Sequence, residues 1–107
     1  MGEILVTHKF LMDAFKEITG LEKRSLASKY LHFHCPDQFF IYDSRARASI
    51  GSIVKRPNKD FIDGMDCDPE YGDYVCRMLE LQEYLNERLG IYESPRNLDD
   101  YLLAKKR

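Results

Sequence analysis

An acid and a base stand two residues apart where the chain passes from an apolar segment into a predicted helix. Asp43 follows the segment 38–42, and Arg45 comes directly after the turn. A carboxylate at such a position caps the helix, because it accepts hydrogen bonds from the free amides of the first turn. It also serves as an acid–base group or stabilises an oxocarbenium ion when it lies in a pocket. The catalytic interpretation predicts a pocket around Asp43 and a raised pKa.

A second group with chemical potential is His32, His34 and Cys35. Zinc requires four N or S ligands, usually supplied as closely spaced pairs. His32 and Cys35 share a helical face while His34 points elsewhere, and the remaining cysteines, Cys67 and Cys76, form no CxxC pair. We therefore expect no metal and no cofactor, and instead a packed pair of histidines, His32 and His34, with a buried thiol at Cys35. A metal-dependent regulator that uses His32, Cys35 and a further cysteine is the weaker alternative.

Basic residues cluster after Asp43 at Arg45, Arg47, Lys55, Arg56 and Lys59. Binding to nucleic acid depends largely on neutralising phosphates, so the formal net charge of −2 argues against a general DNA or RNA binder. Two interpretations stay open for the cluster. It forms a local binding patch for nucleic acid or protein, or it is a solvated charged face, as most charge runs are.

The composition is that of a globular chain, with 44% hydrophobic and 32% charged residues among 107. This length predicts a single domain over residues 1–107. No apolar run approaches the ~20 residues of a membrane span, and no signal peptide is visible, so we expect a cytoplasmic protein that does not enter a membrane. Three cysteines at irregular spacing predict free thiols rather than a disulfide framework.

Hydrophobic periodicity and capping residues predict an all-α fold of about five helices. Ser25 is the expected N-cap of the second helix, which Pro36 ends, and Gly20 and Gly90 are expected stops for the first and fourth helices. Asp68, followed by Pro69, is the expected start of the fourth. The predicted helical segments are 3–19, 25–35, 43–55, 68–89 and a last one from 94, with Leu98, Tyr101 and Leu102 on one face.

Three further features complete the prediction of the fold. The apolar segment 38–42 is either a buried crossing or one edge of a short two-stranded hairpin. The segment 56–67 is polar, carries Pro57 and Gly64, and is expected to be a loop. In the first helix, the core stripe is expected to be widened by apolar residues four apart, namely Val6, Phe10, Ala14 and Ile18.

The chain from Gly20 to Arg45 resembles the second half of a helix-hairpin-helix DNA glycosylase core. Gly20-Leu21 stands where the hairpin of that family begins, and a basic pair, an alanine-bearing helix and an apolar return follow. Asp43 matches the family's catalytic aspartate. The chain is still more similar to small uncharacterised proteins related to that fold, which also end in a motif resembling residues 94–102. The resemblance implies a helical fold and shared ancestry with enzymes that process nucleobases.

Two departures from the family shape the functional expectation. Glu22 replaces the second hairpin glycine, and a carboxylate there repels the phosphate that a hairpin binds through its amides. Only 19 residues precede Gly20, which we expect to be too few to wall a base pocket. We therefore expect a non-catalytic binding or scaffold protein. It is expected to form a homodimer that covers the apolar surface of the segment 39–42 and of the fourth helix.

The alternative is an enzyme that acts on a nucleobase or nucleoside. In that case Asp43 is the catalytic carboxylate and Arg45 clamps a phosphate, with His32 or Lys29 as a helper. The two hypotheses differ in what should surround Asp43, and in whether the chain self-associates.

Overall fold

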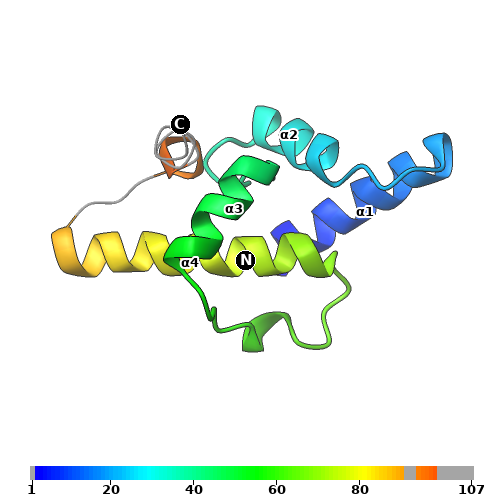
Figure 1. The fold of residues 1–107 in the computed structure, drawn as a ribbon. Helices are drawn as coiled ribbons and strands as arrows, with labels where there is room; N and C mark the ends of the chain where they lie inside the picture. The colour runs from blue at the N-terminus through cyan, green and yellow to red at the C-terminus, as the bar shows by residue number, and fades with distance from the viewer. Residues whose placement is uncertain (1, 91–93, 99–107) are drawn as a thin grey trace.

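The longest helix, α4 (Pro69–Leu89), forms the axis around which the rest of the chain is arranged (Figure 1). The computed structural model describes residues 2–90 and 94–98. As expected, Asp68 caps α4 by accepting a hydrogen bond from the amide of Tyr71, and Pro69 occupies the first turn, where a missing amide proton costs nothing. Gly90 ends the helix in the left-handed conformation at φ 66°.

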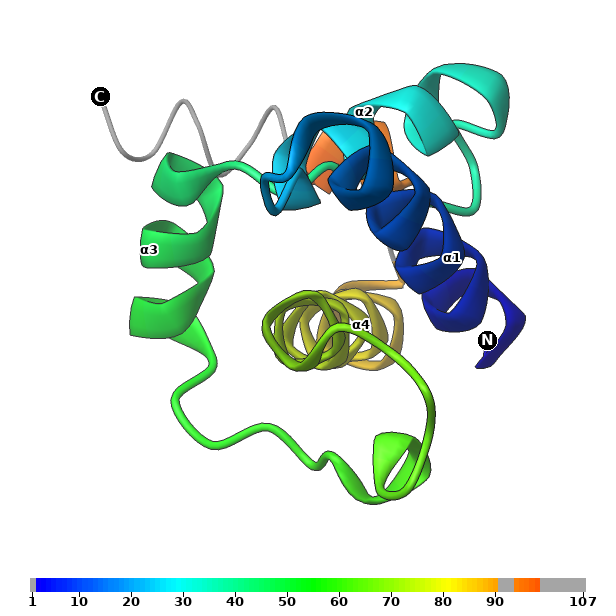
Figure 2. The ribbon, with the colours of Figure 1, turned by 90° about the vertical axis from the view of Figure 1, so that its right-hand side faces the viewer.

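The N-terminal half of α4 is enclosed on all sides. Every residue from 71 to 76 is buried, including the polar Asp73. A view along the helix shows why, because α1 (Gly2–Thr19) and α3 (Ser44–Ile53) lie on opposite sides of it and the segment before α4 passes beneath (Figure 2). Toward its C-terminus α4 projects beyond this surround, and Leu89 is exposed there. Because this half of α4 is buried on every side, an apolar stripe along one side of the helix is not sufficient to predict its burial.

Helices α1 and α2 (Arg24–His34) form a pair joined by a short turn, and we call residues 2–34 the α1–α2 hairpin. Gly20 permits the turn because it adopts a φ of 74°, which disfavours other residues. The predicted cap at Ser25 is wrong. The helix begins one residue earlier, at Arg24, and the N-cap Lys23 has no side-chain cap hydrogen bond. Ser25 instead lies in the first turn, where its carbonyl accepts a hydrogen bond from the hydroxyl of Ser28.

The segment 38–42 is a buried crossing, and no strand forms in residues 2–90 or 94–98. The alternative prediction of a two-stranded β-hairpin is therefore wrong. Its polar backbone is satisfied by side chains instead of by a second strand. The hydroxyl of Tyr71 donates to the carbonyl of Phe40 over 2.6 Å, and the ring nitrogen Nδ1 of His32 lies 2.7 Å from the carbonyl of Phe39. The amide of Tyr42 donates to the Oγ atom of Ser28. These bonds replace a strand ladder.

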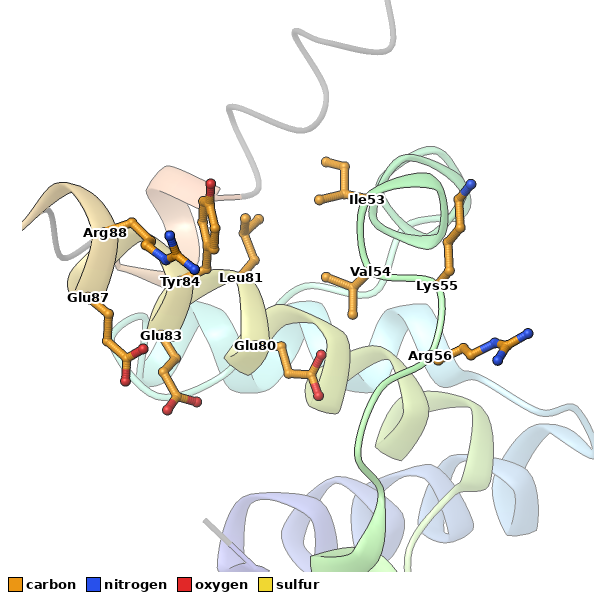
Figure 3. A pocket seen from close by; sticks show the side chains of 10 residues that line it. All are labelled: Ile53, Val54, Lys55, Arg56, Glu80, Leu81, Glu83, Tyr84, Glu87 and Arg88. Carbon is orange, nitrogen blue, oxygen red and sulfur yellow. The ribbon is translucent and has the colours of Figure 1, made fainter.

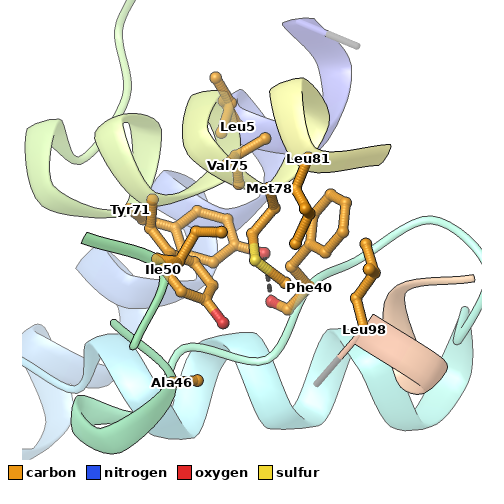
Figure 4. Close-up of a cluster of buried hydrophobic side chains, with 10 residues drawn as sticks. Leu5, Phe40, Ala46, Ile50, Tyr71, Val75, Met78, Leu81 and Leu98 are labelled. Atoms are coloured by element: carbon orange, nitrogen blue, oxygen red, sulfur yellow. Dashed lines mark hydrogen bonds between the residues drawn. The ribbon is translucent and has the colours of Figure 1, made fainter. Parts of the chain in front are cut away.

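The core lies where the crossing, α3 and α4 meet, with Leu5 of α1 reaching in (Figure 4). Phe40 sits in its middle and is 2% exposed. The expectation that the crossing and the stripe of α4 stay bare for a second copy is therefore wrong for Phe39, Phe40 and the stripe from Tyr71 to Leu81, which are buried within the chain. The buried cluster comprises Leu5, Phe40, Ala46, Ile50, Tyr71, Tyr74, Val75, Met78, Leu81 and Leu98. Its members come from five separate stretches of sequence, so the core depends on contacts between elements rather than within them.

The remaining segments agree with the predicted pattern in outline. Helix α3 ends at Ile53, two residues before the expected boundary. Its C-cap residue, Val54, has an extended backbone. The predicted loop contains one short 3-10 turn, η1 (Asp60–Ile62). The last predicted helix is seen over 95–98 with Leu98 buried, while Tyr101 and Leu102 lie outside the described residues.

The all-α prediction with about five helices is confirmed, and the radius of gyration is 13.5 Å. None of the described helices combines the length and the apolar character that crossing a bilayer demands.

A buried histidine, His8, connects the α1–α2 hairpin to α4. The ring of His8 stacks on that of Tyr71 with centroids 3.7 Å apart, and its Nε2 atom lies 3.2 Å from the carbonyl of Arg24. Its Nδ1 atom is buried without a hydrogen-bond partner among the described residues. Burial lowers the pKa of His8 below the ordinary value of 6.5, and this outweighs the neighbouring Asp68 carboxylate. The folded protein therefore keeps His8 neutral.

This histidine predicts acid sensitivity of the fold. Below about pH 6.5 the unfolded chain binds a proton at His8 more readily than the folded chain does, because the pKa of His8 is lower in the folded chain. The free energy of unfolding should therefore fall as the pH drops from 7.5 to 5.5. Denaturant unfolding at both pH values measures this. His8→Phe keeps a ring against Tyr71 and should show a smaller fall. Equal falls in the two proteins would refute the assignment to His8.

Candidate functional site

Asp43, the predicted catalytic carboxylate, lies at the N-cap of α3. Its Oδ1 atom accepts hydrogen bonds from the amides of Arg45, at 2.8 Å, and Ala46, at 3.4 Å. Burial alone would raise its pKa, but these amides and the Arg45 guanidinium 3.5 Å away outweigh it and lower the pKa of Asp43. The direction is opposite to that expected for a general acid. The geometry is complete as a cap, and the catalytic role stays a prediction without support here.

Arg47, one of the predicted binding residues, is engaged within the protein. Its guanidinium contacts Glu70 at 2.9 Å and Asp73 at 3.2 Å, which ties α3 to α4. A Cβ atom at Gly51 would lie 2.7 Å from the guanidinium nitrogen of Arg47, so any other residue there would require the arginine side chain to shift. A glycine in a helix interior costs about 1 kcal/mol relative to alanine, and here it leaves room for Arg47.

Asp73 is the centre of this charge network. Besides Arg47 it binds Lys59 at 3.2 Å and Arg77 at 2.8 Å, so three cations surround one buried carboxylate. Burial opposes ionisation of Asp73, but the hydrogen bonds from Arg77 and Lys59 outweigh it and lower its pKa. Arg77 also donates to the carbonyl of Val54. The network holds the end of α3 and the loop against α4, which is a structural task.

Lys55 and Arg56 remain exposed and border an open groove of about 720 Å³ between the end of α3 and the projecting half of α4 (Figure 3). Ile53 and Val54 point toward α4 across the groove, whereas the charged ends of Lys55 and Arg56 point away. The opposite border is lined by Glu80, Leu81, Glu83, Tyr84, Glu87 and Arg88. The polar groups at its two borders do not converge on one point, whereas those of small-molecule sites usually do.

Lys29 and His32 are separated by burial although they lie on one helix. Lys29 is exposed and lines a shallow hollow of about 390 Å³ at the start of α2, together with Arg24 and Tyr42. His32 is buried and bonded to the crossing, as described above. The structure therefore does not bring Lys29, His32 and Asp43 into one pocket, and Asp43 lines neither this hollow nor the groove.

The expected packed histidine pair and buried thiol are wrong at His34 and Cys35, which are both exposed. Burial raises the pKa of Cys76 to about 11 and also raises that of Cys67, which keeps both protonated at neutral pH. Within residues 2–90 and 94–98, no group of three or more His, Cys, Asp or Glu side chains is arranged to hold a metal ion.

The most unusual surface is on the outer side of α1. Val6, Phe10 and Ile18 were expected to widen the core stripe, but they face away from it, and Phe10 and Ile18 are 75% and 80% exposed. Spacings of four and eight residues place them along one side of the helix. The core side is formed instead by Leu5, His8 and Met12. We call the exposed side, with Val6, Phe10 and Ile18, the α1 face.

Helix α2 has a matching surface. Leu26, Tyr30 and Phe33 follow at spacings of four and three residues, so they lie on one side of the helix. All three are exposed, and Phe33 is 82% exposed. Ala27, Ser28 and His32 form the buried side. We call the exposed side, with Leu26, Tyr30 and Phe33, the α2 face.

The core-side position predicted from the sequence for Val6, Phe10 and Ile18 is wrong. Apolar residues surround most of α1, so periodicity alone does not tell the core side from the outer side. One signal was available, because Met12 and Phe10 lie on different sides of the helix and only one side can meet α4.

No protein-family model, curated protein or solved structure matches the chain. The α1 and α2 faces and the charges around them are therefore the features that bear on function.

Proposed function

We propose that this protein is a non-catalytic binding module that forms a homodimer through the α1–α2 hairpin. The observation that carries the proposal is the exposure of three large apolar side chains, Phe10, Ile18 and Phe33, on two neighbouring helices. Folded monomers rarely leave large apolar patches in water, and such patches usually mark interaction sites. Its resemblance to a glycosylase half-core concerns shape and ancestry in this proposal.

A second copy of the chain is the occupant that this surface favours. Two-fold dimers are the commonest protein assemblies, and they use the same surface on both copies. The hairpin offers two apolar helical faces, so two copies can pack as a four-helix arrangement. Aromatic residues such as Phe10 and Phe33 are the type that contributes most to association, because each buries a large area at low entropic cost.

Catalysis at Asp43 is the competing hypothesis, and the local geometry gives it less support. The carboxylate is engaged by two amides, its pKa is lowered and it lines neither the groove nor the hollow at α2. Binding of nucleic acid through the basic residues is weakened as a hypothesis by the pairing of Arg47 with Glu70 and Asp73.

Solvent accessibility of the hairpin side chains tests the proposal. In NMR spectra with a soluble paramagnetic reagent, the methyl groups of Ile18 and Leu26 should lose accessibility as the protein concentration rises, because a second copy covers them. Leu89, which is 61% exposed on the projecting end of α4, is the internal control and should not change. If Ile18 and Leu26 stay as accessible as Leu89 at every concentration, the proposed dimer surface is wrong.

A further inference from the structure

We propose that the α1 face of one copy packs against the α2 face of the other, and that the two-fold axis repeats this contact. This inference rests on the proposed homodimer and specifies how its helices pair. It follows from the charges on the two faces, which are opposite in sign. The α1 face is apolar and acidic, and the α2 face is apolar and basic.

The acidic character of the α1 face comes from Glu3 and Glu17. Each is seven residues from Phe10, which is about two helical turns, so both lie on the same side as that ring. Both are exposed. The cations of α1 are already paired within the hairpin, because Lys9 binds Asp13 at 2.6 Å and Lys16 binds Glu22 at 2.8 Å. Glu3 and Glu17 therefore set the sign of the field around Phe10.

The basic character of the α2 face has a simple origin, because the sequence of α2 contains no Asp or Glu. Lys29 is exposed three residues after Leu26 and four before Phe33, which places it among the apolar side chains. Lys23 precedes the first turn and lines the same hollow as Lys29 and Leu26. The one strong cation of α2 outside this face, Arg24, is held by Asp68.

Charge complementarity decides between the two ways of pairing two hairpins. Pairing α1 with α1 and α2 with α2 brings carboxylates against carboxylates and ammonium groups against ammonium groups, which is unfavourable. Pairing α1 with α2 brings Glu3 and Glu17 toward Lys23 and Lys29 of the other copy. Because a two-fold axis generates both contacts together, the favourable pairing occurs twice in each dimer.

Charge reversal tests the pairing, with Kd measured by sedimentation equilibrium. The variant Glu3→Lys/Glu17→Lys makes both faces basic, so its Kd should rise by about tenfold or more. The matched variant Lys23→Glu/Lys29→Glu makes both faces acidic and should weaken in the same way. The four changes combined restore opposite signs and should return Kd to within about threefold of the original. All four positions lie outside the core, and circular dichroism checks that each variant is folded.

The alternatives give different results. If α1 packs against α1 instead, the Glu3→Lys/Glu17→Lys variant replaces repulsion between carboxylates by repulsion between ammonium groups, and its Kd should not change. An unchanged Kd would therefore refute the pairing of α1 with α2, although the homodimer itself would stand. Added salt should weaken the original dimer under the proposed pairing, whereas strengthening by salt contradicts it. A chain that stays monomeric at all concentrations refutes the homodimer itself.

Discussion

Replacing both Phe10 and Phe33 by serine should raise the dimer Kd by more than about 100-fold. Buried aromatic residues at the centre of an interface typically contribute about 2 kcal/mol or more each, and about 1.4 kcal/mol corresponds to tenfold in Kd. Sedimentation equilibrium over a range of concentrations measures the change. The two rings lie on different helices, so each serine variant alone should produce part of the effect.

A matched substitution separates this effect from a general loss of surface hydrophobicity. Leu89 is exposed on the projecting end of α4, away from the hairpin, and Leu89→Ser should leave the Kd unchanged. Neither change should unfold the protein, because Phe10 and Phe33 are 75% and 82% exposed and make little of the core. A Kd that responds equally to the hairpin and α4 variants would contradict an interface on the α1 and α2 faces.

Asp68→Ala should lower the free energy of unfolding by about 3 kcal/mol. Asp68 accepts two hydrogen bonds from the guanidinium of Arg24, at 2.5 and 3.0 Å, and also caps α4 through the amide of Tyr71. Removing one member of a buried ion pair typically costs about 3–5 kcal/mol, and Arg24 is partly exposed, which favours the lower end. Denaturant unfolding measures the loss, which is large against a typical stability of about 5–15 kcal/mol.

Asp68→Asn divides that loss into its two parts. The amide oxygen of asparagine still accepts the hydrogen bond from Tyr71 and still caps α4. What is removed is the charge of the pair with Arg24 and the hydrogen bond from its Nη2 atom, which an amide nitrogen cannot accept. We expect a loss between zero and that of the alanine variant. If alanine costs less than about 1 kcal/mol, the link between the hairpin and the start of α4 is not what holds these elements together.

Local signals in the sequence were sufficient for most helix boundaries. The α4 start at Asp68-Pro69 and its stop at Gly90 are where the capping chemistry places them, and Asp43 caps α3 as expected. The failure at Ser25 has a physical reason. The chain turns at Gly20 and enters the helix at Arg24, whose side chain is drawn to Asp68, 44 residues away in sequence. No local pattern contains that partner.

The functional surface was harder to predict for the same reason. Whether Phe10 is buried depends on which side of α1 meets α4, and that is set by the stacking of His8 on Tyr71 and by Leu5 in the core. The basic residues are close together in sequence but differ in environment. Arg47 forms an ion pair with Asp73 in the space that Gly51 leaves, whereas Lys55 and Arg56 are exposed. Contacts between distant segments made these distinctions.

If a second copy covers the α1 and α2 faces, the mass of the unmodified chain in solution must depend on its concentration. Sedimentation equilibrium should show a transition with rising concentration from the mass of one 12.6 kDa chain to that of two. A mass that stays at one chain up to about millimolar concentration would leave Phe10, Ile18 and Phe33 uncovered and would refute the homodimer.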